Sequence, residues 1–210
     1  MKKIAIFASG GGSNFKAIYE KIITGYIPAE ICLVVSNNPT CGAIDFAEHN
    51  ALPTFIFNKT IYPDTNIQNV MLARNLLKAK IDLICLAGYM KMIPKNIVAR
   101  YKNRILNIHP SLLPDFGGKG FYGMKVHEAV IQSNAIESGA TVHFVDDKYD
   151  HGPIIIQKKV KVEAYDTPDV LAKKVLILEH RIYPEVVKAF CEGRIVFKNN
   201  KPKIEVIIEN

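Results

Sequence analysis

Five short apolar runs without regular polar alternation constrain the fold of this chain most strongly. They lie at residues 4–8, 31–35, 53–57, 83–87 and 105–108. A continuous run of this kind is typical of a strand buried on both faces, as in a parallel sheet. Helical patterns lie between the runs, the clearest being at Val70, Leu72, Ala73, Leu76 and Leu77. Alternating strands and helices predict right-handed crossovers and an α/β fold with a doubly wound, mostly parallel twisted sheet.

The pattern changes after residue 138. Residues 140–145 alternate as a half-buried strand and 154–162 form another, so we expect a mixed or antiparallel C-terminal part. Thr167 and Pro168 are an N-cap and a first helical residue. The helix that follows keeps one apolar face, with Val170, Leu171, Val175, Leu178 and Ile182. Pro184 should kink or divide this helix. No low-complexity linker interrupts the chain, which predicts a single domain over 1–210.

Charge and composition exclude several function classes. The 210 residues carry 27 basic and 20 acidic side chains, a net charge of +7, which favours an anionic partner. The lysines are scattered and no tryptophan is present, so we expect small-molecule substrates rather than nucleic acid. The apolar runs are far shorter than the ~20 residues that span a bilayer, so we expect no membrane partner. The first apolar run is also too short for a signal peptide, which predicts a cytoplasmic protein.

Ser9 to Asn14, with three consecutive glycines, follow the first strand and open the first helix. Glycines let the backbone approach a ligand, and N–H groups at a helix start bind anions. A dinucleotide fingerprint would need glycine where Phe15 stands, and no Gly-Lys-Ser/Thr of a Walker motif follows. We interpret Gly11, Gly12, Ser13 and Asn14 as a cradle for a single phosphate, with a purely structural turn as the alternative.

Asn107 and His109 begin a second motif at the carboxyl end of a buried strand, where ligands bind in open α/β sheets. Strand alternation puts both side chains on the same side, about 6.6 to 7 Å apart. An amide donor beside a histidine suits a developing oxyanion in acyl-type transfer. No Ser or Cys stands in a nucleophile elbow, which favours direct transfer over a covalent intermediate.

Asp150 lies in an acidic turn between the last two predicted strands. Next to His109, its carboxylate would raise the histidine pKa and hold the ring as imidazolium. The alternative is a solvated acidic turn. The other histidines, His127, His143 and His151, have no metal-ligand spacing, and we expect no metal.

Four segments taken together resemble the phosphoribosylglycinamide formyltransferases of purine biosynthesis. The resemblance runs nearly end to end, on Gly11-Gly12-Ser13-Asn14, Leu86-Ala87-Gly88-Tyr89-Met90, Asn107-Ile108-His109-Pro110-Ser111-Leu112-Leu113-Pro114 and Asp150-His151-Gly152-Pro153. The third segment is shared by the wider formyltransferase group. The glycine loop distinguishes the substrate, because in this family it holds the phosphate of glycinamide ribonucleotide.

The resemblance implies a role for each matching residue. Asn107, His109 and Asp150 match the catalytic trio, and Glu179 matches an acid that contacts the ribonucleotide. The donor, 10-formyltetrahydrofolate, is expected along Met90, Lys91, Met92 and Ile93 and at Asn107. The implied reaction transfers the formyl group to the ribonucleotide amine without a metal. The phosphate-binding half would be about 1–100 and the catalytic and folate half about 101–210.

Alternatives remain at this stage. A formyltetrahydrofolate hydrolase or methionyl-tRNA formyltransferase shares the core, although both belong to larger chains. A non-catalytic nucleotide-binding module would use only the glycine loop. Two places depart from the family. Some members have a folate-binding arginine near the start of the helix before residues 83–87, and the matching place here is near Thr65; the segment 117–123 is longer and richer in glycine. Whether the chain is a monomer or a homodimer is left open.

Overall fold

The computed structural model describes residues 1–205, and the chain divides into two compact units. The first unit is Met1–Leu106, and the second begins at Asn107. The predicted single domain, with a phosphate-binding half of about 1–100 and a catalytic and folate half of about 101–210, stays a prediction.

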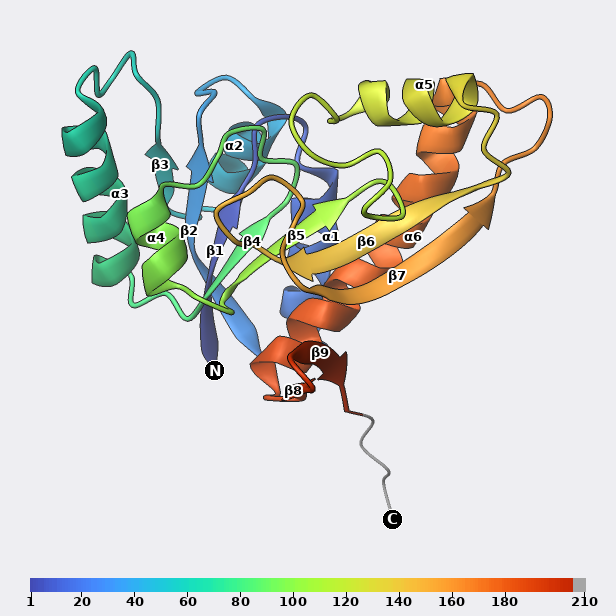
Figure 1. Ribbon diagram of the computed structural model, residues 1–210. Coiled ribbons are helices and arrows are strands. Elements are labelled where there is room, and N and C mark those ends of the chain that lie inside the picture. The colour runs from blue at the N-terminus through green and yellow to red at the C-terminus, as the bar shows by residue number, and fades with distance from the viewer. Residues whose placement is uncertain (206–210) are drawn as a thin grey trace. The chain divides into compact units, whose positions relative to one another are not determined.

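The first unit alternates strands and helices, as the sequence predicts. Its elements are β1 (Lys2–Phe7), α1 (Ser13–Ile23), β2 (Ala29–Ser36), α2 (Gly42–His49), β3 (Thr54–Ile56), α3 (Thr65–Lys78), β4 (Leu83–Leu86) and α4 (Lys95–Arg100). The strand order is β3-β2-β1-β4, and all three pairs are parallel. In Figure 1, α3 and α4 lie beside one another, while α2 lies behind the strands.

The strand order reverses direction beside β1. From β1 the chain proceeds outward to β2 and β3, and then crosses back to place β4 on the other side of β1. In open α/β sheets, ligands bind outside the carboxyl ends of strands at such a switch point. The loops that follow β1 and β4, which contain the glycine run and Met90, therefore flank the expected binding position.

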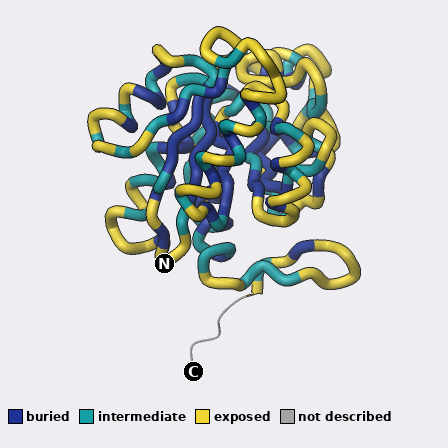
Figure 2. The backbone as a smooth tube through the Cα atoms, turned by 90° about the vertical axis from the view of Figure 1, so that its left-hand side faces the viewer, coloured by how far each residue is buried: buried dark blue, intermediate teal, exposed yellow. Residues whose placement is uncertain are grey.

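Burial explains which predicted helical residues face the sheet. Leu72 and Leu76 of α3 are fully buried, whereas Val70 and Leu77 are 62% and 45% exposed. The predicted apolar face was therefore too wide. At 100° per residue, Val70 lies on nearly the opposite side of the helix from Leu72. Figure 2 shows the buried segments, in dark blue, gathered in the strands.

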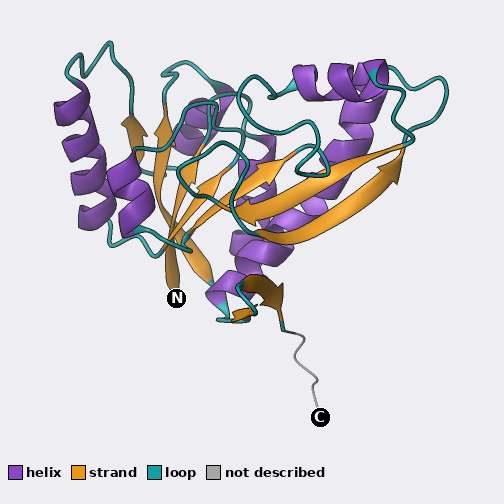
Figure 3. Ribbon diagram, in the orientation of Figure 1, coloured by secondary structure: helices purple, strands orange, loops and turns teal. Residues whose placement is uncertain are grey.

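The second unit contains the antiparallel part. Its elements are the end of β5 (Ile105–His109), α5 (Met124–Gln132), β6 (Glu137–Phe144), β7 (Ile154–Lys161), α6 (Pro168–Cys191), β8 (Ile195–Lys198) and β9 (Lys201–Ile204). The pair β6–β7 is antiparallel, and Figure 3 shows it as a long two-stranded ribbon. The hydrogen-bonded order continues β4-β5-β6-β7, so the predicted mostly parallel α/β sheet with an antiparallel end is confirmed.

The long helix α6 confirms the predicted helix start and contradicts one of the two outcomes expected at Pro184, a division of the helix. Thr167 Oγ1 accepts the N–H of Val170, with Pro168 as the first helical residue. Pro184 does not divide the helix, which continues to Cys191. Proline removes one backbone hydrogen bond. Tyr183 and Val187 beside it are fully buried, and this apolar burial offsets the loss.

Within residues 1–205, no helix combines the length and the apolar character needed to cross a bilayer.

A prediction follows from Gly139, which lies in β6 opposite Lys159 of β7. A Cβ at this position would overlap the backbone oxygen of Lys158 and approach Leu112 Cδ2 to 2.7 Å. Gly139→Ala should therefore destabilise the fold by roughly 1–3 kcal/mol, the usual cost of overpacking. Urea unfolding measures this, with Gly10→Ala as the control because its Cβ would meet no atom within 4 Å. Equal stability of the two variants would contradict the prediction.

Candidate active site

The glycine loop of the first unit has the geometry of an anion cradle. Gly12 is the N-cap of α1 with φ +73°, a left-handed conformation that favours glycine. The first helical bond runs from the Lys16 N–H to the Gly12 carbonyl, so the preceding N–H groups are not used by the helix ladder. The first turn of α1 contains no acidic residue. The positive end of the helix dipole is therefore left available to an anion.

Packing also requires glycine at this turn. A Cβ on Gly12 would lie 3.0 Å from Ala43 Cβ and 3.1 Å from Ala43 Cα, because the start of α2 packs against the loop. The Ala43 N–H donates to the Gly10 carbonyl at 3.0 Å and holds this contact. Of the two predicted side-chain donors, Ser13 is exposed and Asn14 is buried.

The second unit gathers the three residues expected to be catalytic, Asn107, His109 and Asp150, together with His143, which was not predicted. These four residues are here called the catalytic cluster. His109 is 4% exposed, and its Nδ1 lies 3.5 Å from Asp150 Oδ2. The expected proximity of these two side chains is therefore present, although they are 41 positions apart in the chain. Their catalytic roles remain predictions.

Both amide hydrogens of Asn107 are engaged. Its Nδ2 lies 3.0 Å from His143 Nε2 and 3.2 Å from Asp150 Oδ1. His143 Nδ1 lies 2.8 Å from the Phe144 carbonyl, which only accepts, so in the neutral ring Nδ1 carries the hydrogen and Nε2 accepts. The Asp150 carboxylate also accepts. Two acceptors therefore fix the amide nitrogen of Asn107 on their side.

The loop that follows β5 binds the other atoms of the cluster through its backbone. His109 Nε2 lies 2.8 Å from the Phe116 carbonyl, and the Gly118 N–H donates to Asp150 Oδ2 at 2.9 Å. Phe116 and Asp150 have φ values of 54° and 51°, and Gly118 has 91°. Non-glycine residues in the left-handed region indicate strain that the surrounding structure maintains, as is common at functional sites.

The predicted raised pKa of His109 is wrong. Burial lowers the pKa of His109 below its usual 6.5 and outweighs Asp150 and the Phe116 carbonyl, both of which raise it. A buried imidazolium loses its hydration, and one carboxylate at 3.5 Å does not restore that loss. The sequence indicated correctly that Asp150 lies beside His109, but it did not indicate how deeply His109 is buried.

The pKa of Asp150 is shifted in the direction that keeps its charge. Burial alone would raise this pKa, but the lowering by nearby His143, the charge of His109 and the Gly118 N–H is larger. Asp150 is therefore a partly buried carboxylate that stays ionised at neutral pH. This excludes the alternative reading of a solvated turn for Asp150, since its side chain is only 11% exposed.

Several positioning groups were missed in the sequence. His143 was considered only as a metal ligand, yet the alternation of β6 places it beside Asn107. Thr141, two residues earlier on the same face, donates to the Ser111 carbonyl at 2.6 Å and accepts the Leu113 N–H. Strand periodicity could have found both residues. The carbonyl of Phe116 carries no sequence signal, because any residue supplies one.

His127 of α5 is a further buried histidine of this unit. Burial, and then the charge of His109, lower its pKa, so it too is neutral at pH 7. Its Nδ1 has no hydrogen-bond partner among residues 1–205.

The remaining predicted residues lie outside these two groups. Met90 and Met92 are half exposed, Lys91 is exposed, and Ile93 is buried, so the expected folate segment has one anchored residue. Glu179 on α6 is 7% exposed. It is not the surface glutamate that its helical position alone suggests.

Comparison with known proteins identifies the family. The Formyl transferase family model matches residues 2–187. The chain is 47% identical over 200 residues to the chloroplastic phosphoribosylglycinamide formyltransferase of Arabidopsis thaliana, covering 95% of this chain and 68% of the relative. The Bacillus subtilis phosphoribosylglycinamide formyltransferase is 37% identical, covering 90% of this chain and 94% of the relative. The chain belongs to the phosphoribosylglycinamide formyltransferase family.

Solved structures agree with this family. Glycinamide ribonucleotide transformylase 1 from Symbiobacterium toebii aligns with a TM-score of 0.89 at 35% identity, covering 97% of this chain and 94% of that chain. A formyltetrahydrofolate deformylase from Pseudomonas syringae has a TM-score of 0.85 at 23% identity, and 65% of that chain is covered. This second likeness shows a shared fold.

The position of Asp150 predicts how His109 titrates. NMR should give His109 a pKa below 6.5, and Asp150→Asn should lower it further, because the carboxylate is what opposes burial. The unfolded chain takes up this proton at a higher pH than the folded chain does. His109 should therefore lower the free energy of unfolding below about pH 6.5 and leave it unchanged above that pH. A His109 pKa above 6.5, or one unchanged in the variant, would contradict this account.

Proposed function

We propose that this chain transfers the formyl group of 10-formyltetrahydrofolate to the amine of N1-(5-phosphoribosyl)glycinamide in purine biosynthesis. The observation that carries the proposal is the catalytic cluster, in which the partly buried Asn107 and Asp150 meet the buried His109. The phosphate cradle and the names of the relatives support the same substrate.

The first unit would bind the phosphate of the ribonucleotide. Gly11 and Gly12 allow close approach of the backbone, and Ser13 and Asn14 begin the helix whose N–H groups face the anion. Glu179 is proposed to contact the same substrate, as in the family. A carboxylate suits the sugar hydroxyls or the glycinamide nitrogen, since both offer hydrogens.

The reaction itself is a direct acyl-type transfer. The amine nitrogen forms a bond to the formyl carbon, the bond from that carbon to N10 of the folate breaks, and the amine proton passes to N10. Negative charge develops on the formyl oxygen between these steps. A neutral His109 can donate one N–H to this oxygen. Asn107 can donate an amide hydrogen, which is bonded to Asp150 or His143 before the substrate binds.

Asp150 would act in two ways. Its charge favours protonation of His109 as the oxyanion forms, and its oxygen keeps the Asn107 amide oriented. This is a positioning and electrostatic role, in which the charge is already in place before the reaction begins.

The folate donor is proposed to lie along Met90, Lys91, Met92 and Ile93, with Asn107 contributing. Thr65, near the place where some relatives have arginine, is the first residue of α3, and the Asp64 side chain caps this helix by accepting the N–H groups of Asn66 and Ile67. We expect the enzyme in the cytoplasm from its sequence alone, although the plant relatives are named chloroplastic.

A formyl-transfer assay tests the proposal. Absorbance should report tetrahydrofolate formation only when the ribonucleotide is present, and Asn107→Ala should lower kcat by roughly 10² to 10³, the scale of losing one oxyanion donor. Folate product formed equally without the amine would favour the hydrolase that shares this fold. A normal kcat in Asn107→Ala would remove this residue from the mechanism.

Binding measurements test the phosphate cradle. Gly12→Val should weaken ribonucleotide binding because the side chain meets Ala43 and φ is +73°, while folate binding is retained. Gly25→Val is the matched control, with φ +75° and open space around its Cβ, so it carries the same backbone strain without touching the loop. Calorimetry that shows equal loss of both ligands in Gly12→Val would refute the cradle.

A further inference from the structure

We propose that Ser9 is a positioning residue for the formyl donor, acting through the backbone of Met90. The inference rests on the proposed function, because it assumes that the donor lies along residues 90–93. Ser9 is the first residue of the glycine motif, yet its contacts lead to the loop that follows β4 rather than to the phosphate cradle.

Two hydrogen bonds connect Ser9 to the turn after β4. The Ser9 N–H donates to the Gly88 carbonyl at 3.1 Å, and the Met90 N–H donates to Ser9 Oγ at 2.9 Å. Both ends of the turn 88–90 are therefore fixed by one residue. Gly88 has φ +75°, so the turn takes a conformation that few other residues would adopt.

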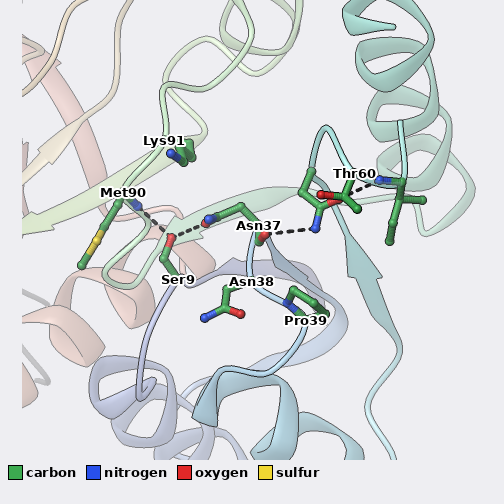
Figure 4. Close-up of a pocket in the computed structure, with 9 residues that line it drawn as sticks. Ser9, Asn37, Asn38, Pro39, Thr60, Met90 and Lys91 are labelled. Carbon is green, nitrogen blue, oxygen red and sulfur yellow. Dashed lines mark hydrogen bonds between the residues drawn. The ribbon is translucent and has the colours of Figure 1, made fainter. Parts of the chain in front are cut away.

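Asn37 orients the hydroxyl of Ser9. Ser9 Oγ donates its single hydrogen to Asn37 Oδ1 at 2.5 Å, which leaves a lone pair for the Met90 N–H. The Asn37 carbonyl in turn accepts from Asn58 Nδ2 at 3.2 Å. Figure 4 shows this chain of bonds from Met90 through Ser9 to Asn37. It joins the loops that follow all four strands of the first unit.

These loops surround a pocket of about 530 Å³ at the switch point beside β1. Met90 and Lys91, the first two residues of the expected folate segment, form one side of it. The lining contains no acidic side chain, and Lys91 is its one charged residue: Ser9, Asn37, Asn38, Pro39, Asn58, Thr60, Ile61, Met90 and Lys91. Ser9 therefore lines this pocket and also holds Met90, which forms part of the same lining.

The same bonds separate Ser9 from the phosphate cradle. Its N–H donates to Gly88 and its hydroxyl hydrogen to Asn37, so neither donor remains for an anion. The two ends of the glycine motif consequently have different tasks. Gly12 and Ser13 open the helix for the ribonucleotide, and Ser9 holds the segment for the folate.

Steady-state kinetics with both substrates tests this assignment. Ser9→Ala should raise the KM for 10-formyltetrahydrofolate by roughly 3- to 10-fold, the equivalent of one hydrogen bond, and leave the KM for the ribonucleotide unchanged. Asn37→Ala should shift the same KM in the same direction. Ser9→Thr keeps the hydroxyl and Asn37→Asp keeps an acceptor, so each should remain near the wild-type value.

Thr24→Ala is the matched control, because among residues 1–205 Thr24 Oγ1 bonds to the carbonyls of Glu20 and Lys21 at the end of α1 and to no other group. An unchanged folate KM in Ser9→Ala, or an equal rise for both substrates, would overturn the assignment. If the wild type forms no product, the proposed function fails instead. Calorimetry with tetrahydrofolate on wild type and Ser9→Ala would then still decide the role of Ser9.

Discussion

The partly buried carboxylate of Asp150 makes the interactions on which the catalytic cluster depends. An ionised group away from water is costly unless donors replace its hydration. Asp150 receives the Gly118 N–H and the Asn107 amide, with His109 and His143 within 4 Å. These partners come from β5, β6 and the loop after β5, so satisfying one charge fixes the relative placement of three segments. The left-handed φ of Asp150 is maintained by the same bonds.

Much of this arrangement could be predicted, because its signals are local. Buried strands produce continuous apolar runs, and a glycine at a helix start indicates an anion site, so β1, Gly12 and the end of β5 were found from the sequence. Asp150 was expected in the same site, but its hydrogen bond with Asn107, across 43 positions, was not predicted, and neither was the contact of Asn107 with His143 across 36 positions. Burial had the largest effect on what was missed. It reverses the expected shift of His109 and places Glu179 inside the unit.

Pro184 shows the limit of a local rule in the same way. A proline inside a helix removes one hydrogen bond, and the sequence rule predicts an interruption. The rule omits the gain from the neighbours, several of which are fully buried, including Tyr183, Val186 and Val187. Each buried side chain of this size contributes about 1.5–3 kcal/mol, which is enough to offset one lost bond.

The orientation of Asn107 follows from which of its neighbours can only accept. The carbonyl of Phe144 can only accept, so Nδ1 of His143 carries a hydrogen, and in the neutral form of the ring Nε2 is then the acceptor. A carboxylate lies on the other side, so the amide nitrogen must turn toward both. If an oxyanion accepts one of the Asn107 amide hydrogens, His143 or Asp150 loses its hydrogen bond with Asn107. Because His109 Nε2 is also bonded to the Phe116 carbonyl, each predicted oxyanion donor must exchange a protein partner for substrate. Transfer therefore requires small rearrangements within a cluster that is already assembled.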